Sequence, residues 1–183
     1  MNKFWVILSL AGFLASSSAY AQEEELSARD IVLATLSGAK TGYDGISVTV
    51  FVMGADGNYT QRAPDQPFYD GEKFRIRLTS TTDGILNITN INPQGISKPL
   101  FSQAVIHGTE VNIPADPSSA FSFSGTKGME TLSLLVTPNQ TTSDAWPAAK
   151  DIRLVTQSTA DSGYLVRPAG SGPISSNLTI RHQ

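Results

Sequence analysis

The sequence predicts an all-β fold, an antiparallel immunoglobulin-like β-sandwich, with one short helix near the N-terminus. Two observations lead to this class. Short segments rich in β-branched and aromatic residues recur at close spacing along the chain, and Gly, Pro, Asn or Asp separates almost every pair of them. This punctuation is typical of antiparallel sandwiches and barrels. No repeat of fixed period is visible, so we expect one domain over residues 22–183.

Residues 1–21 predict a secretory signal peptide. Lys3 precedes an apolar run over residues 4–15, and Ala19-Tyr20-Ala21 supplies an A-x-A cleavage site. The run is short for a bilayer core of about 30 Å, so an uncleaved anchor is the weaker alternative. Cleavage after Ala21 leaves a periplasmic or secreted domain without a membrane span.

Composition excludes several classes of function. The chain has no cysteine, which excludes disulfides, thiolate metal sites and thiol catalysis. Its formal net charge is −3, and loss of Lys3 with the signal peptide makes it −4. A chain without clustered basic residues is a poor ligand for nucleic acid or for anionic membrane surfaces. We therefore expect neither as a partner.

The mature chain opens with an expected helix over residues 27–36. Ser27 fits the N-cap, Asp30 lies in the first turn, and Gly38 follows the end. The alternative is a strand through residues 31–33.

Strands are expected from there to the C-terminus. Residues 46–53 are β-branched and aromatic and precede the hairpin dipeptide Asp56-Gly57. Residues 74–78 alternate apolar and basic side chains with period two, as a strand with one wet face does. The remaining expected strands are 85–91, 105–106, 111–113, 121–123, 131–137, 152–156, 164–166 and 178–181, and looser segments are expected at 138–149 and 159–173.

The stretch over residues 83–101 contains the clearest local signals. Its apolar parity switches near Asn90, which predicts a β-bulge or the end of the strand. We expect Asn90 to cap the following turn, in which Pro93 fixes φ and Gly95 takes a positive φ. The alternative is that Asn90 and Asn92 face a ligand.

Residues 68–135 resemble the bacterial family catalogued as domain of unknown function 4384. The ordered matches are "FYDGEKFRIRLTS", "DGILNITNINPQG", the pair Leu100-Phe101, "NIP" at 112–114, and "GMETLSLLV" from Gly128. The chain departs from the family pattern by having Ile85 and Asn87 where aromatic residues are favoured, Glu72 where Asp follows the glycine, and Ser102 in place of Pro. The resemblance implies an exported or envelope-attached β-domain, and the family offers no catalytic residues to transfer.

Three short motifs together mimic a penicillin-recognising serine enzyme. Ser124 and Lys127 fit S-x-x-K, Lys40 begins K-T-G, and residues 175–177 fit S-x-N. Their order along the chain is wrong, and glycines bracket Lys127 between two expected strands, whereas the enzyme needs a buried helix there. The two histidines, His107 and His182, form no ligand pair or triad that the sequence reveals. We expect no catalytic, cofactor-binding or metal-binding residues.

The preferred hypothesis is a non-catalytic exported module that binds a protein of a bacterial envelope or secretion assembly. Loops around Trp146 and Tyr164, together with Asn90 and Asn92, are the expected interaction surface, although both aromatic rings also suit a role in the core. The alternative is a periplasmic domain that binds a small ligand or a glycan, and a hydrolase is the third option.

Overall fold

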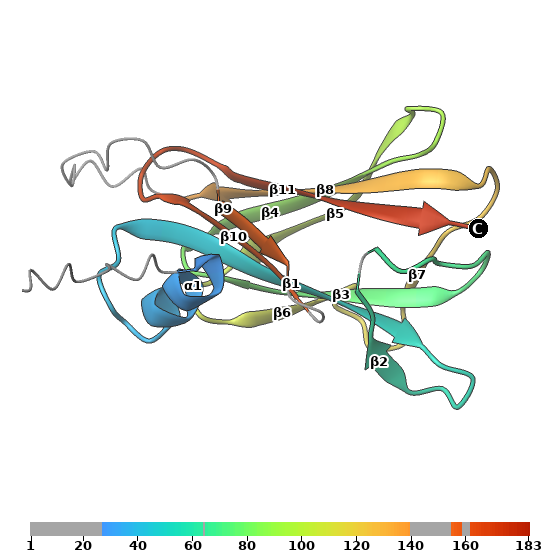
Figure 1. Cartoon of the computed structure of the whole chain (residues 1–183), viewed down its shortest axis with the longest axis horizontal. Helices are drawn as coiled ribbons and strands as arrows, with labels where there is room; N and C mark the ends of the chain where they lie inside the picture. Colours follow the sequence, from blue (N-terminus) through green and yellow to red (C-terminus); the bar gives the residue numbers. More distant parts are fainter. Residues whose placement is uncertain (1–26, 64, 140–154, 159–161) are drawn as a thin grey trace, which may run out of the picture.

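The computed structural model describes residues 27–63, 65–139, 155–158 and 162–183. It confirms an all-β sandwich of two antiparallel sheets with one short helix (Figure 1). Sheet A has the strand order β6-β3-β1-β10-β9, with β2 paired to β1 and β7 paired to β3. Its strands are β1 (Tyr43–Met53), β2 (Tyr59–Gln61), β3 (Lys73–Ser80), β6 (Glu110–Ile113), β7 (Phe121–Ser122), β9 (Val155–Ser158) and β10 (Gly163–Pro168).

Sheet B has the order β11-β8-β4-β5 and packs against sheet A. Its strands are β4 (Gly84–Ile91), β5 (Ser97–Val105), β8 (Gly128–Pro138) and β11 (Ile174–His182). Period-two alternation places every second side chain of the long strands in the core. The buried side chains include Ile46, Val48, Val50 and Val52 from sheet A and Leu132, Leu134 and Val136 from sheet B. Burying each contributes roughly 1.5–3 kcal/mol.

The predicted helix is confirmed as α1 (Ala28–Leu36), so the alternative strand is wrong. The Ser27 side chain caps it by accepting a hydrogen bond from the Asp30 backbone N–H, and Gly38 follows with φ of 89°. The helix covers part of the outer face of sheet A, where Ala28, Ile31 and Val32 pack on Val166 of β10 (Figure 1).

Most predicted strands are confirmed with shifted ends, and β5 is the main error. The sequence predicted a strand only at residues 105–106, whereas β5 runs from Ser97 to Val105. Of the looser segments, residues 140–149 lie outside the described residues, as do 152–154 of the strand expected at 152–156. The described part of 159–173 contains β10 and a short turn before β11.

The predicted irregularity in residues 83–101 is a bulge, and it lies in the pairing of β4 with β5. Ile88 pairs with Phe101 and Thr89 with Pro99, so Leu100 is an extra residue on β5.

The predicted cap of the turn after β4 was assigned to the wrong asparagine. The Asn92 side-chain oxygen accepts from the backbone N–H groups of Gln94 and Ile96, at 3.1 and 2.8 Å, and Gly95 has φ of 78° as expected.

Candidate functional site

The strand β5 forms one edge of sheet B. On one side, β5 pairs with β4. Within the described residues, no other hydrogen bond reaches the backbone of residues 101–105. In an antiparallel pair, alternate residues of an edge strand direct their N–H and C=O groups away from the sheet. Residues 101–105 therefore offer a row of unpaired backbone donors and acceptors, which is the usual template for adding another strand.

The other half of β5 carries features that prevent such pairing. Lys98, Pro99 and the bulge at Leu100 lie together in this half. A charged side chain, a residue without an N–H and a local twist are three common protections of edge strands. Residues 101–105 have none of these, since their sequence is Phe-Ser-Gln-Ala-Val and their pairing with β4 is regular.

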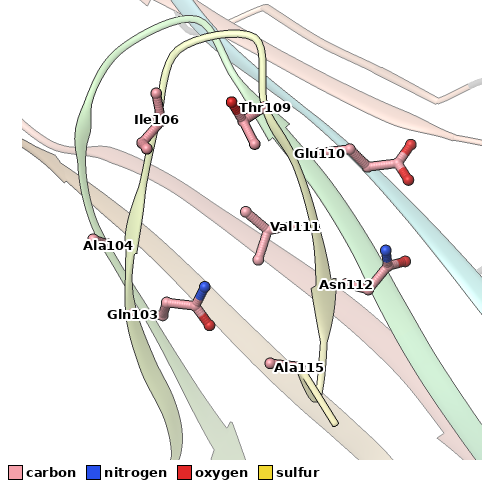
Figure 2. Close-up of a pocket in the computed structure, with 8 residues that line it drawn as sticks. All are labelled: Gln103, Ala104, Ile106, Thr109, Glu110, Val111, Asn112 and Ala115. Atoms are coloured by element: carbon pink, nitrogen blue, oxygen red, sulfur yellow. The ribbon is translucent and has the colours of Figure 1, made fainter. Parts of the chain in front are cut away.

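A groove of about 270 Å³ runs beside this unprotected half, between β5 and β6 (Figure 2). The two strands are consecutive in the chain and form edges of opposite sheets, so the groove lies along one open side of the sandwich. Ile106, at the end of β5, lines it and is 60% exposed. The lining residues are Gln103, Ala104, Ile106, Thr109, Glu110, Val111, Asn112 and Ala115.

The charge in this lining is compensated. Glu110 is its single ionisable residue, and its Oε1 lies 3.1 Å from Nε of Arg77 on the neighbouring strand β3. The groove therefore presents apolar and neutral polar groups beside a free strand edge. We call residues 101–105 and this lining the open edge.

A second hollow, of about 540 Å³, lies against the β4–β5 pair around the bulge. Asn87, Thr89 and Ser102 contribute amide and hydroxyl groups to it, and Phe101 contributes an aromatic ring. Every residue of its lining is uncharged. Both hollows thus lie beside β5.

A polar cluster, formed by Asn90, Glu130, His182 and Asp70, lies at one end of the core. Asn90 Nδ2 donates to Glu130 Oε2 at 2.9 Å, and His182 Nδ1 lies 3.9 Å from Glu130 Oε1. On its other side, His182 Nε2 lies 3.3 Å from Asp70 Oδ1. Asn90 Oδ1 and His182 Nδ1 are buried without a hydrogen-bond partner.

This polar cluster brings acid–base groups together, but two of them, Glu130 and His182, are buried, and only Asp70 is exposed. The side chain of His182 has no exposed surface, and the ring of Phe123 lies 5.8 Å from its own ring. A substrate therefore has no direct route to the imidazole in this conformation. The arrangement was not predicted from the sequence, although one signal was present. Glu130 shares the parity of Leu132 and Leu134, which predicts an inward carboxylate.

Three of the four residues predicted as an interaction surface are described, and each has a local structural role. Asn90 belongs to the polar cluster, and Asn92 organises the turn after β4. Tyr164 is half-buried and packs against the cluster that α1 forms with Val166 on the outer face of sheet A. Trp146 lies outside the described residues.

The serine-enzyme motif is spread over the molecule. Lys40 precedes Tyr43 at one end of β1, whereas Ser124 and Lys127 follow β7, which lies beside the other end of β1 (Figure 1). Nine residue steps along the strand, at about 3.3 Å each, separate these ends by about 30 Å.

The other predicted candidate, His107, stabilises a turn, since its Nδ1 lies 2.7 Å from the Thr81 carbonyl oxygen.

Two further features of the described residues bear on function. No group of three His, Cys, Asp or Glu side chains is placed there to share a metal ion. No described helix has the length and apolar character that crossing a membrane requires.

Comparison with known proteins adds no homologue. No protein-family model, curated protein or solved structure matches this chain. The resemblance to the domain of unknown function 4384 therefore remains a prediction.

Proposed function

We propose that this chain is an exported, non-catalytic binding module that docks a protein partner of the bacterial cell envelope through its open edge. The observation that carries the proposal is the junction of a free strand edge, residues 101–105, with a groove whose single carboxylate, Glu110, is paired with Arg77. Edge strands that serve no partner are usually protected along their length. Here the protection stops at Leu100.

The non-catalytic part of the proposal has two supports. Glu130 and His182 of the polar cluster are buried, and Lys40 lies at the opposite end of β1 from Ser124 and Lys127. A fluorescent β-lactam should therefore leave the mature protein unlabelled. Covalent labelling at Ser124 would contradict this part of the proposal.

The docking part is tested by site-specific photo-cross-linking in the cells that produce the protein. A benzoylphenylalanine is placed at Gln103 or at Ala115, which face the groove, and at exposed Asp56 in the β1–β2 turn as the control. We expect one defined cross-linked partner from Gln103 and Ala115 and none of that species from Asp56. Equal cross-linking from Asp56, or none from the groove positions, would contradict the proposal.

Export is tested separately by fractionation and mass spectrometry. The protein recovered outside the cytoplasm should begin at Gln22. A cytoplasmic protein that retains residues 1–21 would contradict the predicted signal peptide and the envelope location.

A second candidate function is the binding of a small neutral ligand or a glycan. The hollow of about 540 Å³ favours it, because its volume lies within the usual range for ligand sites, about 300–1,000 Å³, and its amide and hydroxyl groups suit a sugar. Titration with chitotetraose, followed by NMR, should then shift the amide signals of Asn87 and Ser102. An unchanged spectrum at millimolar sugar would remove the support for this site with neutral glycans.

A further inference from the structure

We infer that the occupant of the open edge is an extended segment of the partner protein, which joins sheet B as a fifth strand beside β5. The inference rests on the proposed function and deepens it by stating the partner's form. Three properties of the open edge define that form: its backbone groups, the lining of its groove and its length.

The backbone groups require a strand. Two or three residues among 101–105 direct their N–H and C=O groups outward, at the regular spacing of a β-ladder. Only another extended backbone matches several such groups in register, whereas a side-chain surface or a small molecule satisfies one or two. Strand addition of this kind is a recurrent mode of peptide recognition.

The groove sets the side chains of the added strand. Alternate side chains of a strand point to opposite faces, so every second residue of the segment faces the groove. There it meets Ile106, Val111 and Ala115, while Glu110 is already paired with Arg77. Burying an unpaired charge at these positions is costly, so the segment carries apolar or small uncharged residues facing the groove.

The length of the segment follows from where regular pairing ends. On one side, regular pairing ends at Pro99 and at the bulge at Leu100. On the other side, β5 is followed by a turn that contains Gly108, whose φ is 69°. Five residues at about 3.3 Å each give a paired stretch of about 17 Å. The groove itself, at about 270 Å³, is slightly smaller than the usual ligand pocket of about 300–1,000 Å³, which suits side chains of a strand better than a whole ligand.

A second copy of this chain fits the groove less well. Pairing through its own β5 would bring a second Gln103 beside the groove, because this residue pairs with Leu86 and shares its inward parity. An amide there would replace the apolar contacts with Ile106 and Val111. We therefore commit to a segment of a different protein.

The test uses peptides as the probe and proline as the perturbation. A phage-displayed library of random heptapeptides is selected on the mature protein, and a selected peptide is synthesised for calorimetric titration. Ser102→Pro and Gln103→Pro are compared, because one of these adjacent residues donates its N–H to β4 and the other directs it outward. The proline variant with the wild-type melting temperature is the one that removes the outward N–H.

We expect this tolerated proline variant to bind the peptide at least about tenfold more weakly than wild type, because it loses a backbone hydrogen bond and its ring obstructs the incoming strand. Ser102→Ala and Gln103→Ala keep the N–H, so each should lose less affinity than the proline variant at the same position. Lys127→Ala, in an exposed loop outside the open edge, should bind within about threefold of wild type. If both proline variants unfold, Ala115→Arg replaces them, because it fills the groove from an exposed position and should cause a similar loss.

Three results would overturn the inference. They are a library that yields no binder, a tolerated proline or Ala115→Arg variant with unchanged affinity, and dimers of the mature protein that form through β5. The outcome is separable from that of the proposed function. A partner cross-linked from Gln103 but insensitive to proline would retain the docking function and reject strand addition, whereas absent cross-linking would reject the docking function whatever the peptides do.

Discussion

At the scale of single residues, Arg62 and Glu72 connect the end of β2 to the start of β3. Arg62 Nη1 lies 2.6 Å from Glu72 Oε2, and the Tyr69 backbone N–H donates to the same oxygen at 3.1 Å. Burial raises the pKa of Glu72, but the hydrogen bonds from Arg62 and Tyr69 outweigh it and hold the pKa below its ordinary value. The carboxylate therefore stabilises the fold when it is ionised.

This pKa predicts a pH-dependent effect of Glu72→Gln. A lowered folded-state pKa gives stability that is fully present above the unfolded pKa of about 4.3 and is lost as pH falls through the folded value. Glu72→Gln should lower the free energy of unfolding by about 1 kcal/mol at pH 7, because the pair is partly exposed. In urea denaturation, the difference between the two proteins should shrink as the pH falls below about 4.3 and should vanish below the folded-state pKa. A constant difference across this range would contradict the account.

The polar cluster gives a second prediction at this scale. Glu130→Ala removes the acceptor of the Asn90 amide and leaves a cavity, so the free energy of unfolding should fall by about 2–3 kcal/mol. Glu130→Gln keeps an acceptor oxygen and removes the buried charge, so it should stay within about 1 kcal/mol of wild type. Urea denaturation at pH 7 distinguishes them. Equal stability of Glu130→Ala and wild type would show that the cluster does not support the core.

At the scale of elements, the helix α1 approaches sheet A closely at Gly45. A Cβ atom at this glycine would lie 2.8 Å from Val32 Cγ2 of the helix, 2.9 Å from Val166 Cγ1 and 2.7 Å from the Leu165 carbonyl oxygen. These contacts are too short for the helix and strand to keep their present positions. Because Gly45 has no side chain, α1 can pack closely on β1 and β10.

Gly45→Ala should therefore lower the free energy of unfolding by about 1–3 kcal/mol through overpacking. Gly163→Ala is the matched control on the neighbouring strand, because its nearest contact would be the Val48 carbonyl oxygen at 3.9 Å. The control should change stability by less than about 1 kcal/mol. Equal losses in the two variants would show that the cost comes from strand glycines in general and not from helix contact.

The strand β5 predicts the effect of removing its protections. In Lys98→Thr/Pro99→Val, the charge and the residue without an N–H are both lost, so more of the strand can pair with another chain. The double variant should show a concentration-dependent increase in mass by light scattering. Lys127→Thr makes the same change of charge in an exposed loop and should stay at the wild-type mass. A double variant that keeps the wild-type mass at every concentration would contradict this role of Lys98 and Pro99.

The sequence allowed most elements to be predicted because their signals are local. Residues 46–53 and 74–78 alternate with period two because one face is buried, and Ser27 and Gly38 mark the ends of α1. The strand β5 lacks such a signal. Pro99 argues against a strand, and most side chains of an edge strand face solvent, so its burial does not alternate.

The candidate site was less predictable because its residues meet through topology. Gln103 and Val111 belong to opposite sheets, and the groove between them depends on which strands form the edges. Likewise, Glu130 and His182 are 52 positions apart (182 − 130) and meet through the pairing of β8 with β11. An inward carboxylate could be identified by parity, but its partner could not.

At the scale of the whole molecule, the described residues form a closed core with an unprotected stretch of sheet edge, residues 101–105, beside a groove. At the opposite edge of sheet B, the backbone of Phe68 exchanges hydrogen bonds with Arg181 and Gln183 of the C-terminal end. This contact covers only the end of β11, since residues 174–180 have β8 as their single ladder partner within the described residues. A scaffold with an open edge beside a groove is suited to binding an extended segment of another protein.

Amide hydrogen exchange at residues 101–105, measured by NMR without any partner, tests this central claim most directly. If the edge is open, amides bonded to β4 should be protected while the intervening amides exchange at rates near those of an unfolded chain. Protection of all five amides would show that another part of the chain covers the edge, and would contradict the account.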